Sequence, residues 1–239
     1  MGSAGSAAPT LVFLHGSGDD AHVWDALIAH LPQYAAIALD LPGHGALTNR
    51  PGPTTMTVDD YAGAVRAELT RRGLEHVCVV GHSLGSAIAL RMAVEYPALV
   101  SRLALVGAGA RMRVLPALLE EARSDPPAAK WKLVEMGFTP AHLAEARAFF
   151  EQLAPLAPGM LYRDLAACDG FDIMSELGHI DQPTLIVTGE EDRLTPPKYA
   201  RFLAEHLDSA QLALLPNAGH YAQLESPAAV ADAIRAWLG

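Results

Sequence analysis

A serine between glycines is the first residue of this sequence whose setting suggests chemistry. It stands in GHSLG at Gly81–Gly85, after an apolar run at His76–Val80 and before a helix-forming run that begins at Leu84. A serine on a sharp strand-to-helix turn has a strained backbone, and its hydroxyl is exposed at the end of the strand. Glycines two residues before and after it leave room where strand and helix pass close together. We therefore predict that Ser83 is a nucleophile.

A serine hydroxyl is a poor nucleophile unless a general base takes its proton. Ten histidines could serve. We choose His220, because it lies in the loop PNAGH at 216–220, directly after the last apolar run of the chain. His15, His44 and His82 also lie in loops near the ends of apolar runs and remain alternatives. His82 adjoins the nucleophile and must point away from it.

A carboxylate should fix the tautomer of the base and stabilise its charged form. The apolar run Thr184–Thr188 leads into Gly-Glu-Glu-Asp, which offers three carboxylates on one loop. We choose Asp192, which lies deepest in the turn, and keep Glu190 and Glu191 as alternatives. The order serine, acid, base along the chain is that of α/β-hydrolases and differs from that of chymotrypsin and subtilisin.

A glycine-rich turn could hold the negative oxygen that forms when an acyl group is attacked. The sequence LHGSG at Leu14–Gly18 follows the first apolar run, and such a turn can aim backbone amides at one point. We predict that the amides of Ser17 and Leu84 form this oxyanion hole. The alternative for this segment is a plain turn that joins a strand to a helix.

Short apolar runs that alternate with helical stretches supply the elements that position these residues. The runs are continuously apolar, as in strands that are covered on both faces of a sheet. The predicted strands are Thr10–Leu14, Ala35–Leu39, His76–Val80, Leu103–Val106, Thr184–Thr188 and Gln211–Leu215. The predicted helices are Val58–Arg72, Leu84–Glu95, Pro197–His206 and Pro227–Leu238. This alternation predicts an α/β fold with a mostly parallel sheet and helices on both faces.

The alternation stops at about residue 111 and resumes at about residue 179. The stretch 111–178 is rich in proline and helix-forming residues and contains no predicted strand. We predict a helical cap, or lid, at 111–178 over a core formed by 10–110 and 179–239, because open α/β sheets bind ligands at the carboxyl ends of their strands. Three aromatic residues of the cap are expected to contact the substrate, namely Trp131, Phe138 and Phe150.

Composition excludes several classes of function. The formal net charge is −10 and no basic cluster is present, so a nucleic-acid partner is not expected. No apolar run approaches the ~18 residues of a membrane span, and no metal-binding motif occurs. We expect no cofactor, no metal and no stable membrane association. The two cysteines, Cys78 and Cys168, fit a reduced, cytoplasmic protein. Residues 1–9 are expected to be a flexible tail, in which Gly2 and Ser6 match the permissive myristoylation pattern.

Five segments together resemble the α/β-hydrolase superfamily, and in particular its small capped serine hydrolases. These segments are VFLHGSG at Val12–Gly18, LDLPGHG at Leu39–Gly45, VVGHSLGSAIAL at Val79–Leu90, PTLIVTGEEDRLTPP at Pro183–Pro197 and NAGHYAQLESP at Asn217–Pro227. The resemblance implies the triad Ser83, Asp192 and His220, and a structural turn at Asp40 and His44. Members usually carry an antiparallel strand pair before the segment that matches the first strand. Only nine residues precede it here, so we expect about six strands, with Ala35–Leu39 at an edge.

The resulting hypothesis is a serine hydrolase that cleaves carboxylic esters of small or medium apolar substrates through an acyl-enzyme on Ser83. A lactonase or a carbon–carbon bond hydrolase would use the same triad. A ligand-binding receptor on a hydrolase scaffold is the alternative from another class, since a fold does not fix a function. We expect a monomer or a homodimer.

Overall fold

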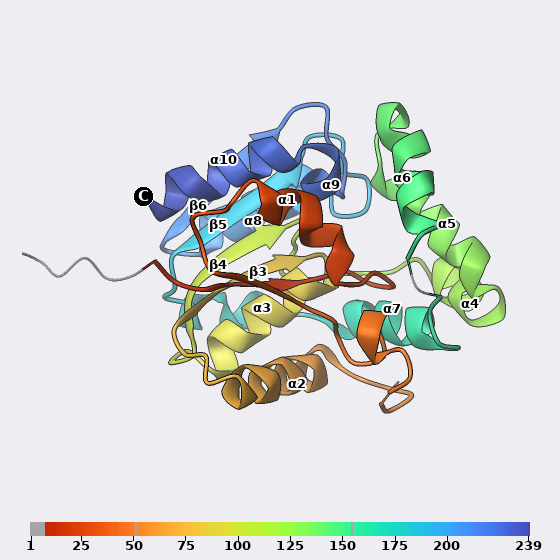
Figure 1. The fold of residues 1–239 in the computed structure, drawn as a ribbon, viewed down its shortest axis with the longest axis horizontal. Helices are drawn as coiled ribbons and strands as arrows, with labels where there is room; N and C mark the ends of the chain where they lie inside the picture. Colours follow the sequence, from red (N-terminus) through yellow and green to blue (C-terminus); the bar gives the residue numbers. More distant parts are fainter. Residues whose placement is uncertain (1–7, 51, 154) are drawn as a thin grey trace, which may run out of the picture.

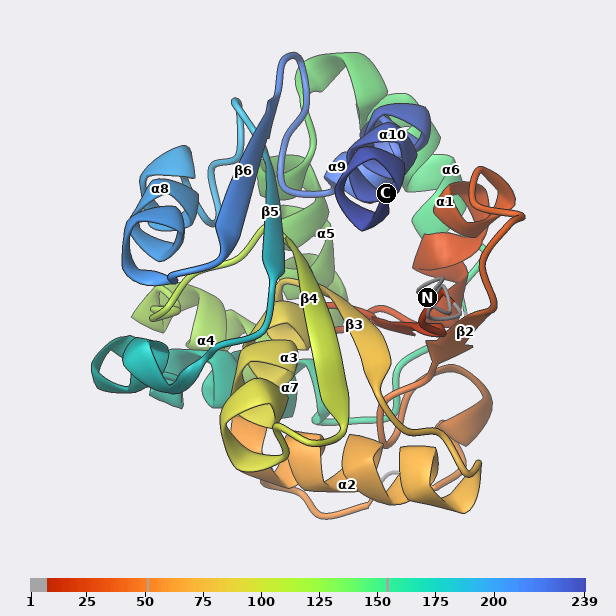
Figure 2. The same cartoon turned by 90° about the vertical axis from the view of Figure 1, so that its left-hand side faces the viewer.

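The centre of the molecule is a twisted sheet of parallel strands, seen in a computed structural model that describes residues 8–50, 52–153 and 155–239 (Figure 1). The strand order is β2-β1-β3-β4-β5-β6. Figure 2 views the sheet along its strands, with β6, β5, β4, β3 and β2 labelled from left to right. The strands are β1 Leu11–Leu14, β2 Ala36–Leu39, β3 Val77–His82, β4 Val100–Val106, β5 Thr184–Gly189 and β6 Ala210–Leu215. All six overlap predicted strands, and β2 lies at an edge as expected. The predicted fold class is confirmed.

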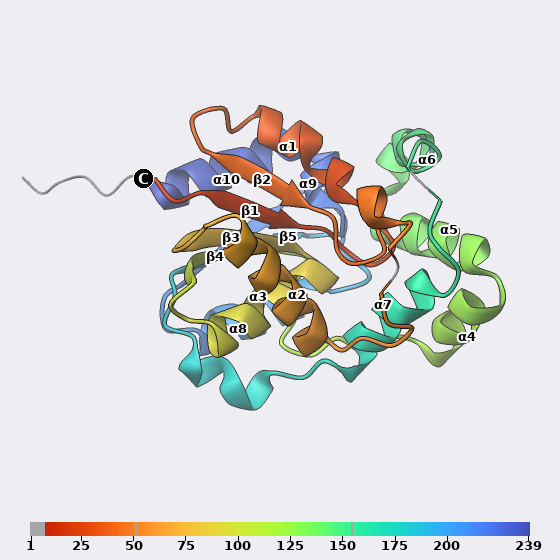
Figure 3. The same ribbon diagram turned by 60° about the horizontal axis from the view of Figure 1, so that its bottom comes forward.

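Alternate residues of each strand point to opposite faces of the sheet, so every strand contributes to two separate hydrophobic cores. In β1, Val12 and Leu14 pack on the face covered by α2, α3 and α8, whereas Leu11 and Phe13 pack on the face covered by α1 and α10 (Figure 3). These helices are α1 Asp25–Ala29, α2 Val58–Arg71, α3 Leu84–Glu95, α8 Pro197–His206 and α10 Pro227–Leu238. The apolar runs are therefore continuous because both faces of the sheet are buried.

The helices of residues 111–178 gather at the carboxyl ends of the strands, on the right-hand side of Figure 1. They are α4 Pro116–Ser124, α5 Pro126–Gly137, α6 Leu143–Phe150 and α7 Met160–Gly170. Some of the prolines in this stretch begin α4 and α5, where the missing N–H costs nothing. Within the described residues of this stretch, the extended structure is an isolated bridge between Arg111 and Asp172.

Shorter elements complete the described chain. They are the 3₁₀ turns Ala21–Trp24, Gly45–Leu47, Pro140–His142 and Met174–His179, and the short helix α9 Ala222–Glu225 that follows the loop of His220. None of the helices described is long and apolar enough to cross a membrane. Most of the predicted tail, with Gly2 and Ser6, lies outside the described residues.

Candidate active site

Ser83 lies on the strained turn that its sequence predicts. Its backbone has φ 51° and ψ −115° between the end of β3 and the start of α3, a conformation that a residue with a Cβ rarely adopts. A Cβ on Gly81 would lie 2.2 Å from the carbonyl oxygen of Gly85, and one on Gly85 would lie 2.1 Å from that of Leu14. Both flanking positions therefore require glycine, which accounts for the G-x-S-x-G pattern.

His220 and Asp192 lie in direct contact on adjacent loops. The Nδ1 atom of His220 is 2.9 Å from Oδ2 of Asp192, and both side chains are almost fully buried. The backbone N–H of His220 donates to the carbonyl of Gly137 at the end of α5, so the loop is also fixed by residues 111–178, which we call the insertion. This contact holds the imidazole in one orientation and leaves its Nε2 atom for the serine.

The Asp192 carboxylate is held by four donors. Its Oδ1 accepts from the N–H groups of Leu194 and Thr195, while Oδ2 accepts from the Thr195 hydroxyl and from His220. Burial alone would raise the pKa of Asp192, but attraction to His220 and these hydrogen bonds lower it below its ordinary value. Glu190 and Glu191 are exposed on the same loop, so Asp192 is the carboxylate that reaches the imidazole.

Thr195 is a residue of this site that the sequence reasoning missed. Its hydroxyl lies 2.8 Å from Oδ2 of Asp192 and 3.1 Å from Nδ1 of His220. An aspartate followed three residues later by threonine often forms such a local side-chain turn, and this spacing was the available signal.

The three other candidate bases have structural partners. His15 accepts from the N–H of Leu41 through Nε2 and faces the carbonyl of Gly16 with Nδ1, and burial lowers its pKa to about 4. His82 contacts the carbonyl of His220 through Nε2, and burial lowers its pKa well below the ordinary value. His44 lies 2.8 Å from the buried Asp164. His15 and His82 are therefore neutral packing groups, and His44 is one half of a buried ion pair.

Ser83 and His220 line the same cavity, which has a volume of about 270 Å³ and lies between the core and the insertion. Ser17 lies in its wall as well, and Leu84 begins α3, where first-turn N–H groups have no partner within the helix. Much of the remaining wall is apolar and comes from the insertion and its ends, through Met112, Val114, Leu115, Leu118, Leu133, Met136, Leu165 and Cys168. Among the described residues, no cluster of three or more His, Cys, Asp or Glu side chains is arranged to hold a metal ion.

The three aromatic residues expected to contact the substrate do not lie in the wall of this cavity, which corrects that expectation. Phe138 stacks on Tyr221 at a centroid distance of 4.7 Å, and Phe150 packs edge-on against the same ring. Trp131 packs against this group and carries the Arg147 guanidinium over its ring. Tyr221, whose ring contacts both Phe138 and Phe150, does line the cavity. The side chains of α5 that reach the cavity are Leu133 and Met136 instead.

Comparison with known proteins gives the class to which this fold and site belong. Residues 11–233 match the model of the alpha/beta hydrolase family, and the chain belongs to that family. A pimeloyl-(acyl-carrier protein) methyl ester esterase of Neisseria meningitidis serogroup C is 30% identical over 232 residues, which are 90% of this chain and 87% of that protein.

Two solved structures extend the comparison. The structure of a thermophilic esterase is 33% identical and superposes with a TM-score of 0.78, covering 95% of this chain and 88% of its own. The enol-lactonase of Burkholderia xenovorans LB400 superposes with a TM-score of 0.86 over 99% of this chain and 94% of its own, at 23% identity. The latter likeness is one of fold.

Proposed function

We propose that this protein hydrolyses carboxylic esters through a covalent acyl-enzyme on Ser83. The observation that carries the proposal is the contact of His220 with Asp192 at the wall of the cavity that Ser83 also lines. The esterase relatives support the same reaction.

The first half of the reaction transfers the acyl group to the enzyme. The Ser83 hydroxyl oxygen attacks the ester carbonyl carbon while Nε2 of His220 takes the hydroxyl proton. The carbonyl oxygen becomes an oxyanion, which the amides of Ser17 and Leu84 would bind. When the carbon–oxygen bond to the alcohol breaks, His220 returns the proton to the leaving oxygen, and the alcohol departs.

The second half repeats these steps with water. A water molecule attacks the acyl carbon and gives its proton to His220, the bond to Ser83 breaks, and the serine oxygen recovers the proton. The products are one carboxylic acid and one alcohol. Throughout, Asp192 stays ionised, because its pKa is lowered, and it stabilises the transient imidazolium.

The insertion supports a proposal about the substrate. We infer that residues 111–178 act as a lid whose aliphatic side chains enclose a small or medium apolar acyl group, since ligand sites are mostly apolar with a few placed polar groups. Leu118, Leu133 and Leu165 carry this proposal, because they both line the cavity and pack against one another within the insertion.

We also place the enzyme in the cytoplasm. Cys78 and Cys168 are free and buried, and burial raises the pKa of each thiol to about 12. Unreactive thiols without disulfide partners are typical of proteins from a reducing compartment.

Labelling and turnover together test the proposed reaction. A fluorophosphonate probe should label the wild-type protein at Ser83 and leave the Ser83→Ala variant unlabelled. A panel of p-nitrophenyl esters of increasing acyl length should then be hydrolysed, with lactones of similar size as the comparison. A labelled protein that turns over lactones and no ester would be a lactonase, and one that turns over neither would support a binding protein.

A further inference from the structure

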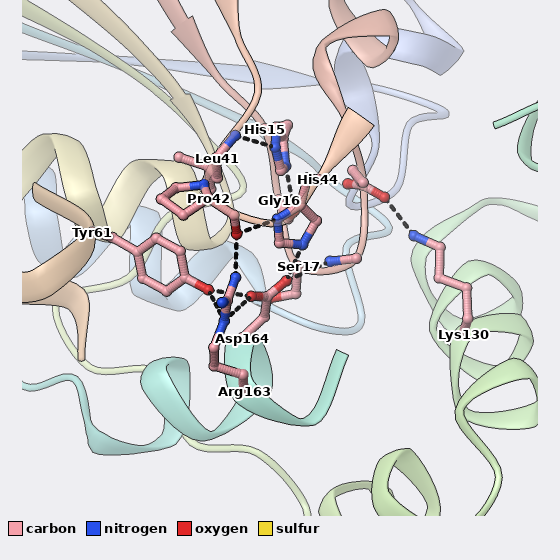
Figure 4. A network of polar contacts seen from close by, with 12 residues as sticks. His15, Gly16, Ser17, Leu41, Pro42, His44, Tyr61, Lys130, Arg163 and Asp164 are labelled. Atoms are coloured by element: carbon pink, nitrogen blue, oxygen red, sulfur yellow. Dashed lines mark hydrogen bonds and ion pairs between the residues drawn. The ribbon is translucent and has the colours of Figure 1, made fainter. Parts of the chain in front are cut away.

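The insertion contacts three consecutive residues, Ser17, Gly18 and Asp19, of the glycine-rich loop that follows β1. The carboxylate of Asp164, on α7, accepts from the N–H of Gly18 at 2.9 Å. One turn further along α7, the Sγ atom of Cys168 lies 3.6 Å from the Ser17 hydroxyl. On α5, Nζ of Lys130 lies 2.5 Å from Oδ1 of Asp19. The glycine-rich loop is therefore clamped between α5 and α7 (Figure 4).

Asp164 is the centre of this contact and is completely buried. Its Oδ2 accepts from Gly18 and lies 2.8 Å from Nε2 of His44, while its Oδ1 accepts from the hydroxyl of Tyr61 (Figure 4). These three partners come from three different segments of the core. A buried carboxylate is costly unless its oxygens are satisfied, and here three donors meet both of them. Asp164 thus joins one insertion helix to the loop and to the core beneath it.

The charges of His44 and Asp164 strengthen the contact between Asp164 and the glycine-rich loop. Burial opposes charge on both groups, yet mutual attraction and hydrogen bonding raise the pKa of His44 and lower that of Asp164. The second nitrogen of His44 faces the carbonyl of Pro42 at 3.2 Å, so both ring nitrogens of the charged form have an acceptor. An ionised Asp164 gives the Gly18 N–H a charge-assisted hydrogen bond, which is stronger than one to a neutral acceptor.

We propose that Asp164 is a positioning residue for catalysis. Through the N–H of Gly18 it holds the glycine-rich loop, whose Ser17 amide would bind the oxyanion. That N–H belongs to the peptide group that joins Ser17 to Gly18, so the bond to Asp164 fixes the plane next to the Ser17 amide. Gly18 has φ +69°, and a Cβ at this position would lie 2.9 Å from a side-chain carbon of Leu161 on α7, so the loop packs directly against that helix. The position of the Ser17 amide then depends on how α7 packs. The inference rests on the proposed function, because it needs an oxyanion to form.

A purely structural role for Asp164 makes a different prediction, and a matched variant separates the two. Tyr61→Phe removes one donor from the same carboxylate but leaves the bond between Asp164 and Gly18 intact. Asp164→Ala removes the acceptor of Gly18 as well. Both substitutions should lower the Tm, because both disturb the buried network. Only Asp164→Ala should disturb the loop that carries the Ser17 amide.

The experiment measures kcat, KM and the affinity for a trifluoromethyl ketone, whose adduct with the serine places an oxyanion in the site. The corresponding secondary alcohol, which forms no adduct, measures ground-state binding. For Asp164→Ala we expect kcat and the affinity for the ketone to fall by about 100-fold, because a displacement of a catalytic group by about 1 Å can cause a loss of this size. KM and the affinity for the alcohol should stay within about threefold of the wild-type values. Tyr61→Phe should keep all four values close to wild type while its Tm falls.

Asp164→Asn supplies a second and less disruptive variant if the alanine variant does not fold. Its amide oxygen can still accept from Gly18, but without charge, so kcat and the ratio of ketone to alcohol affinity should lie between those of wild type and Asp164→Ala. A ratio that stays at the wild-type value in either variant, with only the Tm reduced, would overturn the inference. A wild-type protein that hydrolyses no ester and is not labelled at Ser83 would overturn the proposed function, and this inference with it.

Discussion

The carboxylate of Glu225 accepts a hydrogen bond from the N–H of Gly219, the residue before His220, at 2.6 Å. Its other oxygen accepts from both the N–H and the hydroxyl of Thr139, in the insertion. Glu225 therefore holds the loop of the base to residues beside α5, as Asp164 holds the glycine-rich loop to α7. Each of the two loops that meet at Ser83 is tied to the insertion through a buried carboxylate.

Glu225→Ala should lower both stability and rate. It leaves the buried N–H groups of Gly219 and Thr139 without an acceptor, at a cost of about 1–3 kcal/mol each if water does not replace the carboxylate, whereas the Thr139 hydroxyl keeps its contact with His142. It also frees the loop of His220, so kcat should fall by about tenfold or more. Urea unfolding and ester turnover measure the two effects. Glu205→Ala, on the exposed side of α8, is the control and should change the free energy of unfolding by less than about 0.5 kcal/mol.

Asp192→Asn should lower kcat by about 10⁴-fold, because an amide in place of the carboxylate favours the wrong imidazole tautomer. The fold should survive, since the amide oxygen can still accept from the backbone of Leu194 and Thr195. Glu190→Gln and Glu191→Gln are the matched controls and should keep the wild-type rate in the same ester assay. If either control lost most of its activity while Asp192→Asn stayed active, the acid of the triad would have to be assigned to Glu190 or Glu191 instead.

Ser83→Ala and His220→Ala should each abolish turnover, apart from the residual rate that substrate binding and the backbone amides of the site supply. The double variant should be no slower than either single variant by more than a small factor, since the two residues act as a unit. Steady-state rates with one p-nitrophenyl ester, and circular dichroism as the check on folding, settle the comparison. Losses that multiply in the double variant would mean that the two side chains act independently.

The features that could be predicted from the sequence are those that depend on residues close together in the chain. Strands such as Val77–His82 are apolar throughout because both faces of the sheet are buried, and the motif around Ser83 is dictated by two close backbone approaches. Asp192 and His220 follow strands β5 and β6, whose carboxyl ends lie side by side. The sequence therefore predicted that both residues lie at the carboxyl ends of the strands.

The remaining features depend on packing between distant segments. Asp164 is more than a hundred residues from His44, and nothing near it in the sequence marks it as a partner. Phe138 and Phe150 were expected to contact the substrate, but their place in the predicted cap does not tell what their side chains pack against. They pack against Tyr221, whereas the smaller Leu133 reaches the cavity. The orientation of a helix within the insertion was not encoded in its composition.

The stability that the pair His44–Asp164 contributes should depend on pH with a definite sign. Asp164 has a lowered pKa, so its contribution is complete above about pH 4 and is lost as the pH falls through the folded value. His44 has a raised pKa, so its contribution is complete below about pH 6.5 and is lost as the pH rises through its folded value. The contribution of the pair is therefore largest between about pH 4 and 6.5.

Urea unfolding of wild type and Asp164→Asn across this range measures that contribution. The difference in the free energy of unfolding should be greatest near about pH 5.5 and should narrow as the pH rises through the raised pKa of His44, where the imidazole loses its proton. Glu205→Gln, at an exposed site, should give a difference that does not vary with pH. A wild-type advantage over Asp164→Asn that is equally independent of pH would show that the pair is not ionised.

The aliphatic wall of the cavity should set the preference for acyl length. Each buried methylene contributes roughly 0.8 kcal/mol, so each added carbon should raise kcat/KM by about fourfold until the space is filled. Leu118→Phe narrows the cavity and should move the optimum to shorter acyl chains, whereas Leu133→Ala enlarges it and should move the optimum to longer ones. Phe150→Leu is the control, because Phe150 packs against Tyr221 outside the cavity wall, and it should lower the Tm without moving the optimum. The measurement is kcat/KM over a series of p-nitrophenyl esters. An optimum that moves with Phe150→Leu and stays fixed with both leucine substitutions would mean that the substrate binds on the other side of Tyr221, against the aromatic group.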